Sequence, residues 1–283
     1  MSTRSDALGL PRVHHRLTDS TNERAKELAA AGAPHGTIVT ADEQTAGRGR
    51  LDREWTAPPG AALLASAGFT PPNMPLRHAW RLAATVALAM IDAAEAAAGL
   101  RDDTIWIKWP NDLVADGPDG RLLKLAGVLG ETRSDGDRVT SAVIGIGLNV
   151  DWPAAAFPAD LAPFMTSLRE ISGGRPVDRD VLLEGWLARL EPRLEALTAG
   201  AFDAGGWTKR QRTTGRRVEV DLGGQVVSGL AVGVDPESGA LSVEAEARGP
   251  DGQEGLLVID SGEVVRCRIV DLPRSTRSGI PPA

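Results

Sequence analysis

The chain has 283 residues, of which 42% are hydrophobic and 24% are charged, as expected for a folded globular protein. The net charge of −7 excludes a global basic field that would attract nucleic acid or an anionic membrane. No run approaches the roughly 20 apolar residues of a membrane helix, and the N-terminus lacks the apolar core of a signal peptide. Cys267 is the single cysteine, so we expect no internal disulfide and a cytoplasmic location.

Residues 1–18 are expected to form a mobile lead before the first element. Ser20 and Glu23 have the spacing of a capping box and predict a helix that ends at Gly32. Apolar patterns predict further helices over residues 76–99, 178–199 and 202–212. Apolar runs bounded by turn residues predict strands over 36–44, 61–69, 104–109, 122–133 and 138–150. A polar loop with four basic residues, 45–60, separates the first two strands.

After residue 212 the pattern changes to five short strands joined by glycine-containing turns, which is typical of a small antiparallel barrel or sandwich. Cys267 falls on the last strand, where we expect a small buried hydrophobe. The tail, 272–283, is expected to be disordered. The sequence therefore predicts an α+β fold, with a larger domain over 19–212 and an all-β domain over 213–271.

The loop sequence GRGRLDREW, residues 47–55, alternates glycine with arginine. Accessible backbone N–H groups and guanidinium groups both bind phosphate or carboxylate oxygens, and Trp55 adds a flat face that can cover a ring. A solvated surface loop and an RNA-binding Gly/Arg segment are the alternatives. RNA is disfavoured, because the segment is single, short and flanked by strands in an acidic protein.

Two further segments bring charges to predicted strands. KWPNDL, residues 108–113, places Lys108, Asn111 and Asp112 at one strand end, unless it is an ordinary turn with a tryptophan in the core. In the strand that contains KLAG, residues 124–127, alternation puts Lys124 on the same side as Ala126 and Val128. A charge on such a face indicates either an anionic ligand or an edge strand protected against pairing.

GIGLN, residues 145–149, is a strand in which glycine alternates with larger residues. Such a strand allows a ligand or another backbone to approach closely, and Asn149 offers both a donor and an acceptor to a base edge. The four histidines have no metal-ligand spacing and no paired nucleophile: His14, His15, His35 and His78.

The chain resembles the biotin–protein ligases, or biotin–[acetyl-CoA-carboxylase] ligases, in five motifs and their order. These are DSTN (19–22), the GRGR loop, KWPNDL, KLAG and GIGLN. The resemblance is strong over residues 19–150 and weaker over the C-terminal β-domain, which is similar to the SH3-like cap of that family. It implies a class II synthetase-like core, in which helices flank a central mixed sheet. The chain departs from some relatives at Leu51-Asp52, where they carry Arg-Gly.

The resemblance implies an ATP-dependent ligation in two steps. The carboxylate of biotin attacks the α-phosphate of ATP and gives biotinoyl-5′-AMP and pyrophosphate, with Mg²⁺ held through the phosphates and no direct protein ligand to the metal. A lysine of the biotin carboxyl carrier domain of an acyl-CoA carboxylase then attacks the anhydride and releases AMP. From charge and composition we expect no membrane partner. Because only 18 residues precede DSTN, we also expect no DNA partner and no repressor function, and a monomer is slightly favoured over a homodimer.

The resemblance also assigns residues to the two ligands. The biotin side comprises Ser20, Thr21, Asn22, Gln44, Arg48, Gly49, Arg50, Lys124 and Gly127. Ser20 and Gln44 would hydrogen-bond the ureido ring, and Trp109 would supply an apolar wall. The ATP side comprises Arg48, Arg50, Trp55, Lys108, Asn111, Asp112, Lys124 and Asn149.

Four of these residues are predicted to be catalytic. Lys124 would contact the biotin carboxylate and the α-phosphate, where charge develops, and Arg50 would retain the adenylate. Lys108 and Asp112 would serve the nucleotide–magnesium side and the acceptor lysine. Trp55 would pack near the adenine, and Asn149 would read its edge.

Two other functions remain open at this level. A lipoate–protein ligase shares the fold and the adenylation chemistry, although the GRGR loop with KWPNDL favours biotin. A non-catalytic binder of biotin or of the adenylate is a second alternative, which Arg50 together with Lys124 argues against. Biotin-dependent ATP–pyrophosphate exchange separates an enzyme from a binder.

Overall fold

A computed structural model describes residues 8–246 and 255–270, so the predicted tail, 272–283, lies outside the described residues. The chain divides into two compact units. The first comprises the described residues up to Arg212 together with Asp235–Gly239, and the second comprises Thr213–Val234 and the described residues from Ala240. Each unit has a sheet of its own.

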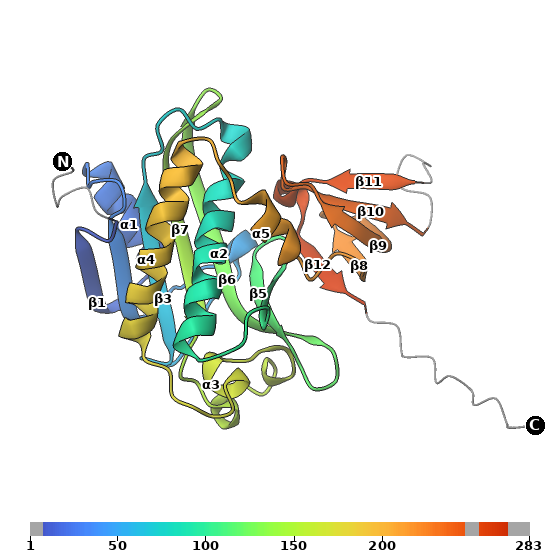
Figure 1. The fold of residues 1–283 in the computed structure, drawn as a ribbon, viewed down its shortest axis with the longest axis horizontal. Coiled ribbons are helices and arrows are strands. Elements are labelled where there is room, and N and C mark those ends of the chain that lie inside the picture. The colour runs from blue at the N-terminus through green and yellow to red at the C-terminus, as the bar shows by residue number, and fades with distance from the viewer. Residues whose placement is uncertain (1–7, 247–254, 271–283) are drawn as a thin grey trace, which may run out of the picture. The chain divides into compact units, whose positions relative to one another are not determined.

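The first unit is built on a seven-stranded sheet in the order β1-β2-β3-β7-β6-β5-β4 (Figure 1). The outer strands β1 and β2 run parallel, and every other neighbouring pair is antiparallel. The bounds are β1 Arg12–Thr18, β2 Ile38–Gln44, β3 Ala62–Phe69, β4 Ile105–Lys108, β5 Asp112–Asp116, β6 Leu122–Asp135 and β7 Arg138–Asn149. The predicted strands and the mixed sheet are therefore confirmed.

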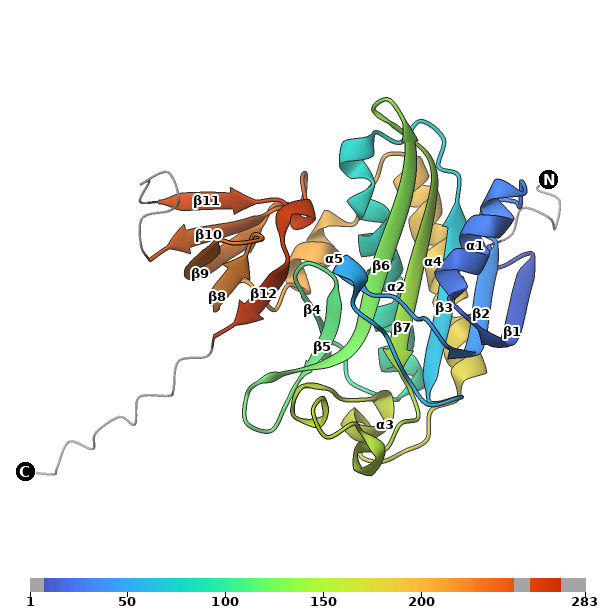
Figure 2. The same ribbon diagram turned by 180° about the vertical axis from the view of Figure 1, so that it is seen from behind.

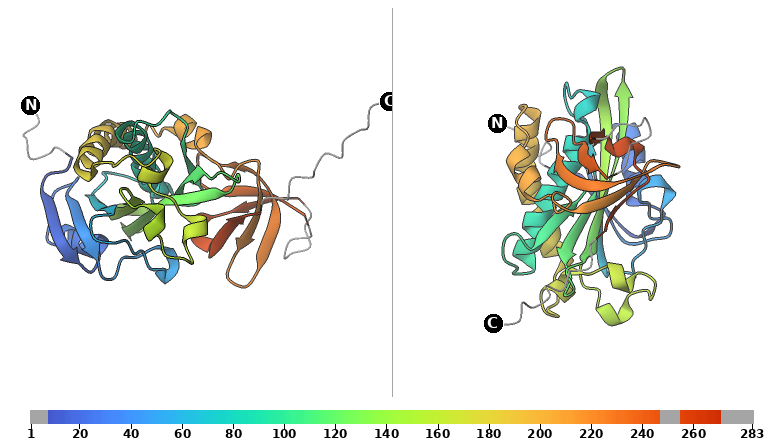
Figure 3. Two further views of the ribbon diagram at one scale, coloured as in Figure 1. Left: turned by 90° about the horizontal axis from the view of Figure 1, so that it is seen from below. Right: turned by 90° about the vertical axis from the view of Figure 1, so that its right-hand side faces the viewer.

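Helices cover both faces of this sheet. α2 (Trp80–Ala97) and α4 (Arg179–Thr198) pack together on one face (Figure 3, left), and α1 (Thr21–Ala30) lies against β2, β3 and β7 on the other face (Figure 2). Small alanine side chains let α2 bury most of its circumference. The short helices α3 and α5 span Leu168–Ile171 and Ala204–Lys209. None of the helices in the described part of the chain is long and apolar enough to cross a bilayer.

Two expectations near the N-terminus need correction. Residues 12–18, expected within the mobile lead, form β1 and pair in register with β2 from Arg12↔Ile38 to Thr18↔Gln44. The run RVHHRLT hides the strand because an edge strand needs no apolar alternation. Ser20 does occupy the N-cap position of α1, but its side chain makes no capping hydrogen bond, so the capping box is absent.

The second unit is an antiparallel sheet in the order β11-β10-β9-β8-β12. Its strands are β8 Arg217–Asp221, β9 Val226–Val234, β10 Leu241–Ala245, β11 Leu256–Ile259 and β12 Arg266–Ile269. All five predicted strands are present, and Cys267 is buried on β12 as expected. Pairing among the described residues leaves β11 and β12 at the two ends of the order, so a closed SH3-like barrel is not confirmed.

A buried ion pair and its hydrogen bonds join α2 to the start of β4 and to the end of α5. Glu95 is almost fully buried and accepts hydrogen bonds from two guanidinium nitrogens of Arg210, each at 2.9 Å. It also accepts from the backbone N–H groups of Thr104 and Ile105. Although burial opposes it, the Glu95 carboxylate raises the pKa of Arg210.

We expect Glu95→Gln to lower the free energy of unfolding by about 3 kcal/mol, because Arg210 would lose its buried counter-charge and keep only the more exposed Asp92 and Asp103, each at 3.5 Å. The measurement is the urea midpoint. Asp119→Asn, which removes an exposed partner of Arg121, serves as the control and should leave the midpoint unchanged. Equal midpoints for the two variants would show that the buried pair contributes nothing.

Candidate functional site

The centre of the site is a strip of sheet without side chains. Gly127 on β6 lies directly opposite Gly147 on β7, and Gly145 extends the strip along β7, opposite Ser66 of β3. All three positions face α1, because alternation turns Ile144, Ile146 and Leu148 to the core on the other side. The glycine strip, Gly127, Gly145 and Gly147, therefore opens the backbone of two central strands to a ligand.

A β-bulge sets the direction of Lys124. The register between β5 and β6 moves from Leu113↔Ala126 to Val114↔Lys124, so Leu125 has no partner. The extra residue puts Lys124 on the same side as the glycine strip, and its Nζ would lie 3.5 Å from a Cβ at Gly127. The expectation that Lys124 shares a face with Ala126 and Val128 is therefore wrong, because simple alternation does not survive a bulge.

Lys124 lies at one end of the strip, within a cluster of charged side chains. Its Nζ lies 2.6 Å from Asp112 Oδ1, and the Lys108 ammonium lies 3.8 Å from the other oxygen of that carboxylate. β6 is an inner strand between β5 and β7, so the edge-strand explanation for Lys124 is also wrong. Two cations around one carboxylate form a net positive site that suits an anionic ligand.

Two predicted asparagines fix the backbone around this cluster. Asn149 is buried and donates to the carbonyl of Thr166 at 2.9 Å, while the N–H of Thr166 donates to the carbonyl of Lys124. Asn111 donates to the carbonyl of Val128 at 2.8 Å and ties the β4–β5 turn to β6. Both lie beside the charges, and their contacts with adenine or ATP stay predictions.

The loop of residues 45–60 folds over the strip. Gly47 and Trp55 close a small hairpin through the Trp55 N–H and the Gly47 carbonyl, and a Cβ at Gly47 would lie 2.3 Å from the Trp55 carbonyl oxygen. Glycine is therefore required at position 47 for this closure. At the tip, Leu51 and Asp52 both have left-handed backbone angles, with φ of 53° and 56°.

The indole of Trp55 lies on the glycine strip. A Cβ at Gly147 would come within 2.5 Å of Trp55 Cε2, and one at Gly127 within 3.4 Å of Cζ3. The Lys124 ammonium lies 5.5 Å from the ring centroid, within the range of a cation–π contact. Trp55 thus lies over Gly127, the residue predicted for biotin.

The opposite end of the strip is lined by hydroxyl and amide groups. Ser66, fully buried on β3, lies 2.8 Å from Thr21 Oγ1 and donates to Asn22 Oδ1 at 2.6 Å. Gln44 accepts from both the N–H and the hydroxyl of Thr21. The structure thereby brings together DSTN and Gln44, which are far apart in sequence. Ser20 is buried beside them.

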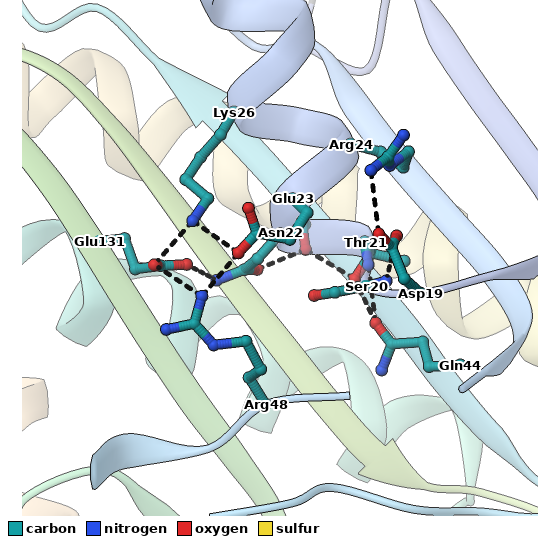
Figure 4. A network of polar contacts seen from close by, with 11 residues as sticks. Asp19, Ser20, Thr21, Asn22, Glu23, Arg24, Lys26, Gln44, Arg48 and Glu131 are labelled. Carbon is teal, nitrogen blue, oxygen red and sulfur yellow. Dashed lines mark hydrogen bonds and ion pairs between the residues drawn. The ribbon is translucent and has the colours of Figure 1, made fainter. Parts of the chain in front are cut away.

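A network of four charges joins α1, β6 and the loop (Figure 4). Arg48 Nη1 lies 2.6 Å from Glu23 Oε1 and 3.5 Å from Glu131 Oε1. Lys26 Nζ lies 2.7 Å and 3.0 Å from the same two oxygens. Hydrogen bonds from Lys26 and then Arg48 lower the pKa of Glu23, and the Glu23 carboxylate raises the pKa of Arg48. The four residues, named here the Glu131 network, are charged and paired.

Sequence reasoning missed part of this site. Glu131, Lys26 and Ser66 were not predicted, because each acts through a residue more than 20 positions away or across the sheet. Trp109 was predicted as a biotin wall, but it is buried in the core and donates through Nε1 to the Gly239 carbonyl. Its position matches the alternative of a core tryptophan in a turn. No metal-binding cluster of His, Cys, Asp or Glu occurs among the described residues.

Comparisons with known proteins agree on one family. The profile of the Biotin/lipoate A/B protein ligase family matches residues 14–149. The Biotin–[acetyl-CoA-carboxylase] ligase of Mycobacterium tuberculosis is 33% identical over 254 residues, 89% of this chain and 87% of that protein. The Bifunctional ligase/repressor BirA of Bacillus spizizenii is 33% identical over 263 residues, 92% of this chain and 75% of that protein.

A solved structure extends the similarity to the fold. The biotin protein ligase of Aquifex aeolicus, in complex with biotin and ATP, superposes with a TM-score of 0.72 at 28% identity. The match covers 92% of this chain and 99% of that one.

We expect Gly145→Ala to destabilise the protein by about 2 kcal/mol, because the new Cβ would lie 2.0 Å from Asn22 Oδ1. Thermal or urea unfolding measures the loss. Gly233→Ala is the matched control, since that strand glycine has no atom within 4 Å of a Cβ. In an Asn22→Ala background the same glycine substitution should cost much less, because the clashing oxygen is absent. A Gly145→Ala protein as stable as the control would contradict the packing described here.

Proposed function

This chain belongs to the biotin protein ligase family and is an ATP-dependent biotin–[acetyl-CoA-carboxylase] ligase, and we propose that it binds biotin along the glycine strip with the carboxylate at Lys124. The activated biotin is then transferred to a lysine of the carrier domain of an acyl-CoA carboxylase. The observation that carries this proposal is the ammonium of Lys124, turned by the bulge onto the open end of the strip and held 2.6 Å from Asp112.

The two ends of the strip suit the two ends of biotin. The ureido ring needs donors and acceptors, which Ser20, Thr21 and Gln44 offer, and Ser20 is not occupied in capping α1. The apolar chain lies over Gly127 and Gly147 once the Trp55 indole that covers them is displaced. From Gly145 to Asn149, four residues of extended strand span about 13 Å, and the carboxylate therefore falls near the charged end.

The first step forms the adenylate. A carboxylate oxygen of biotin attacks the α-phosphorus of ATP, the bond from that phosphorus to the β-bridging oxygen breaks, and pyrophosphate leaves. Negative charge concentrates between carboxylate and phosphate in the transition state, so the Lys124 ammonium stabilises that state more than the ground state. Lys108 adds a second positive charge on the nucleotide side. ATP enters as its magnesium complex, in which the phosphates hold the ion.

The adenine and ribose bind beyond Lys124. Asn149 ends β7 and Asn111 lies in the β4–β5 turn, both next to the charge cluster, and we assign them to the nucleotide side. Arg50, in the loop above the site, retains the adenylate, and Arg48 and Gly49 complete the cover. Trp55 closes over the bound molecule.

The second step transfers the acyl group. The uncharged amine of the carrier lysine attacks the carbonyl carbon of the anhydride, the bond from that carbon to the phosphate oxygen breaks, and AMP leaves. The nitrogen loses a proton, which the Asp112 carboxylate is suited to accept because it borders the reacting group. Lys124 and Lys108 then compensate the charge of the departing AMP.

The loop must move during the cycle. Trp55 lies directly on the glycine strip, so biotin can reach Gly127 and Gly147 only when the indole is displaced. Once biotin is bound, the loop that carries Arg48, Arg50 and Trp55 closes again and excludes water from the anhydride. Opening and closing of residues 45–60 is therefore part of substrate entry.

We expect Lys124→Met to reduce biotin-dependent ATP–pyrophosphate exchange by at least about 100-fold, because the neutral side chain cannot compensate the developing charge. Lys209→Met is the control, since Lys209 forms an exposed ion pair with Asp103. The urea midpoint of each variant establishes that the fold is retained. Exchange at the control rate in Lys124→Met would remove the lysine from the catalytic role.

The substrate and the acceptor are tested in one assay. Protein, MgATP and a purified carrier domain are incubated with biotin or with lipoate, and the carrier mass is measured. We expect a mass increase with biotin only. Labelling with lipoate would overturn the assignment of Ser20 and Gln44 to the ureido ring, and exchange without carrier labelling would overturn the proposed acceptor.

A further inference from the structure

The Glu131 network lies where the loop meets the pocket, and the reaction steps described above use only its arginine, Arg48. Arg48 is the single member that belongs to the loop; Glu23 and Lys26 lie on α1, and Glu131 lies on β6. The three fixed residues are partly buried, with side-chain exposures between 23% and 34%. Ion pairs at such positions are less screened by water than fully exposed ones.

We propose that Glu23 and Glu131 are positioning residues that hold the loop closed through Arg48 and so set how long the activated intermediate stays bound. This inference rests on the proposed function only for the identity of the intermediate. The two ion pairs of Arg48, at 2.6 Å to Glu23 and 3.5 Å to Glu131, are named here the latch.

Charge balance favours the closed loop. Two carboxylates and two cations cancel when Arg48 is docked. When the loop lifts, Arg48 leaves and Lys26 alone faces two carboxylates, so a net negative charge remains beside the pocket. That charge attracts Arg48 back and disfavours a bound anion in the open state. Closure of the loop and retention of an anionic intermediate are therefore favoured by the same charges.

The network is also connected to the pocket by hydrogen bonds. Glu131 Oε2 accepts from Asn22 Nδ2 at 2.9 Å, and Asn22 Oδ1 accepts from Ser66. Ser66 contacts Thr21, whose hydroxyl donates to Gln44. The chain of contacts runs from the loop arginine to the residues assigned to the ureido ring (Figure 4). A group that binds next to Thr21 and Gln44 therefore contacts the same hydrogen-bond chain that orients the Glu131 carboxylate.

Apolar packing holds α1 against the sheet in addition to these charges. The helix is held by an apolar cluster of Ala25, Val39 and Val143, against which Val13 and Leu28 pack. None of these five residues belongs to the Glu131 network. Neutralising a carboxylate of the network should therefore weaken the loop contact without displacing the helix.

The test reads the loop directly. Wild type, Glu23→Gln and Glu131→Gln are treated with trypsin, and cleavage after Arg48, Arg50 and Arg53 is followed by mass spectrometry. We expect both variants to be cut about two- to fivefold faster in the loop, with unchanged urea midpoints. Glu27→Gln is the matched control, because Glu27 lies on α1 and pairs with Arg24 rather than with the loop.

A second measurement follows the intermediate. Adenylate formed from biotin and MgATP without carrier is chased, and its release rate is measured for the same proteins. We expect the release rate to rise in Glu23→Gln and Glu131→Gln by a larger factor than kcat for adenylation falls. If Glu23→Gln and Glu131→Gln are cleaved, and release the adenylate, at the same rates as wild type and Glu27→Gln, the proposed role of the latch is wrong. A wild-type protein that makes no adenylate would instead refute the proposed function, and the trypsin result would still decide the latch.

Discussion

The loss of side chains from one face of two central strands is the constraint on which the site depends. Gly127 and Gly147 lie opposite each other, and Gly145 continues the opening along β7. Glycine in a strand interior weakens a sheet, so the other face has to supply the packing. It does so through β-branched and leucine side chains beneath α2 and α4. The same strands are therefore densely packed on one side and open on the other.

Charge is distributed around this strip in two separate groups. At one end Lys124 and Lys108 surround Asp112 and leave a positive excess. Under the loop, the Glu131 network is balanced. The first group suits chemistry on anions, whereas the second suits reversible docking of a segment, since a neutral assembly forms and separates at modest cost. Catalysis and access are thus supported by different residues.

Much of the fold follows from local sequence. The helix after DSTN, the long alanine-rich helix and the paired strands that contain KLAG and GIGLN are confirmed. β1 could not be predicted, because an edge strand carries no apolar pattern. The direction of Lys124 could not be predicted either, since a bulge is a property of two paired strands and not of one.

The site shows the same division. Motif residues that touch a ligand are visible in the sequence, and the structure brings DSTN to Gln44 and Lys124 to Asp112. Residues that support them are not visible, because Glu131 reaches Asn22 across 109 positions of the chain. Trp109 shows the converse case, in which a residue inside a motif is used for packing. Only the folded chain distinguishes these cases.

The backbone at the loop tip has a consequence for timing. Leu51 and Asp52 hold left-handed angles in the docked loop, a conformation that costs about 1–2 kcal/mol for a side chain such as that of Leu51 and less for aspartate. The docked loop therefore holds backbone strain at its tip, which is relieved when undocking lets both residues return to relaxed angles. The time for which the loop stays docked then depends on two opposing contributions. Backbone strain at the tip favours undocking, and the ion pairs of Arg48 favour docking. Because Glu23 and Glu131, which hold Arg48, lie outside the loop, mutation of these carboxylates can change the ion pairs without altering the sequence of the tip.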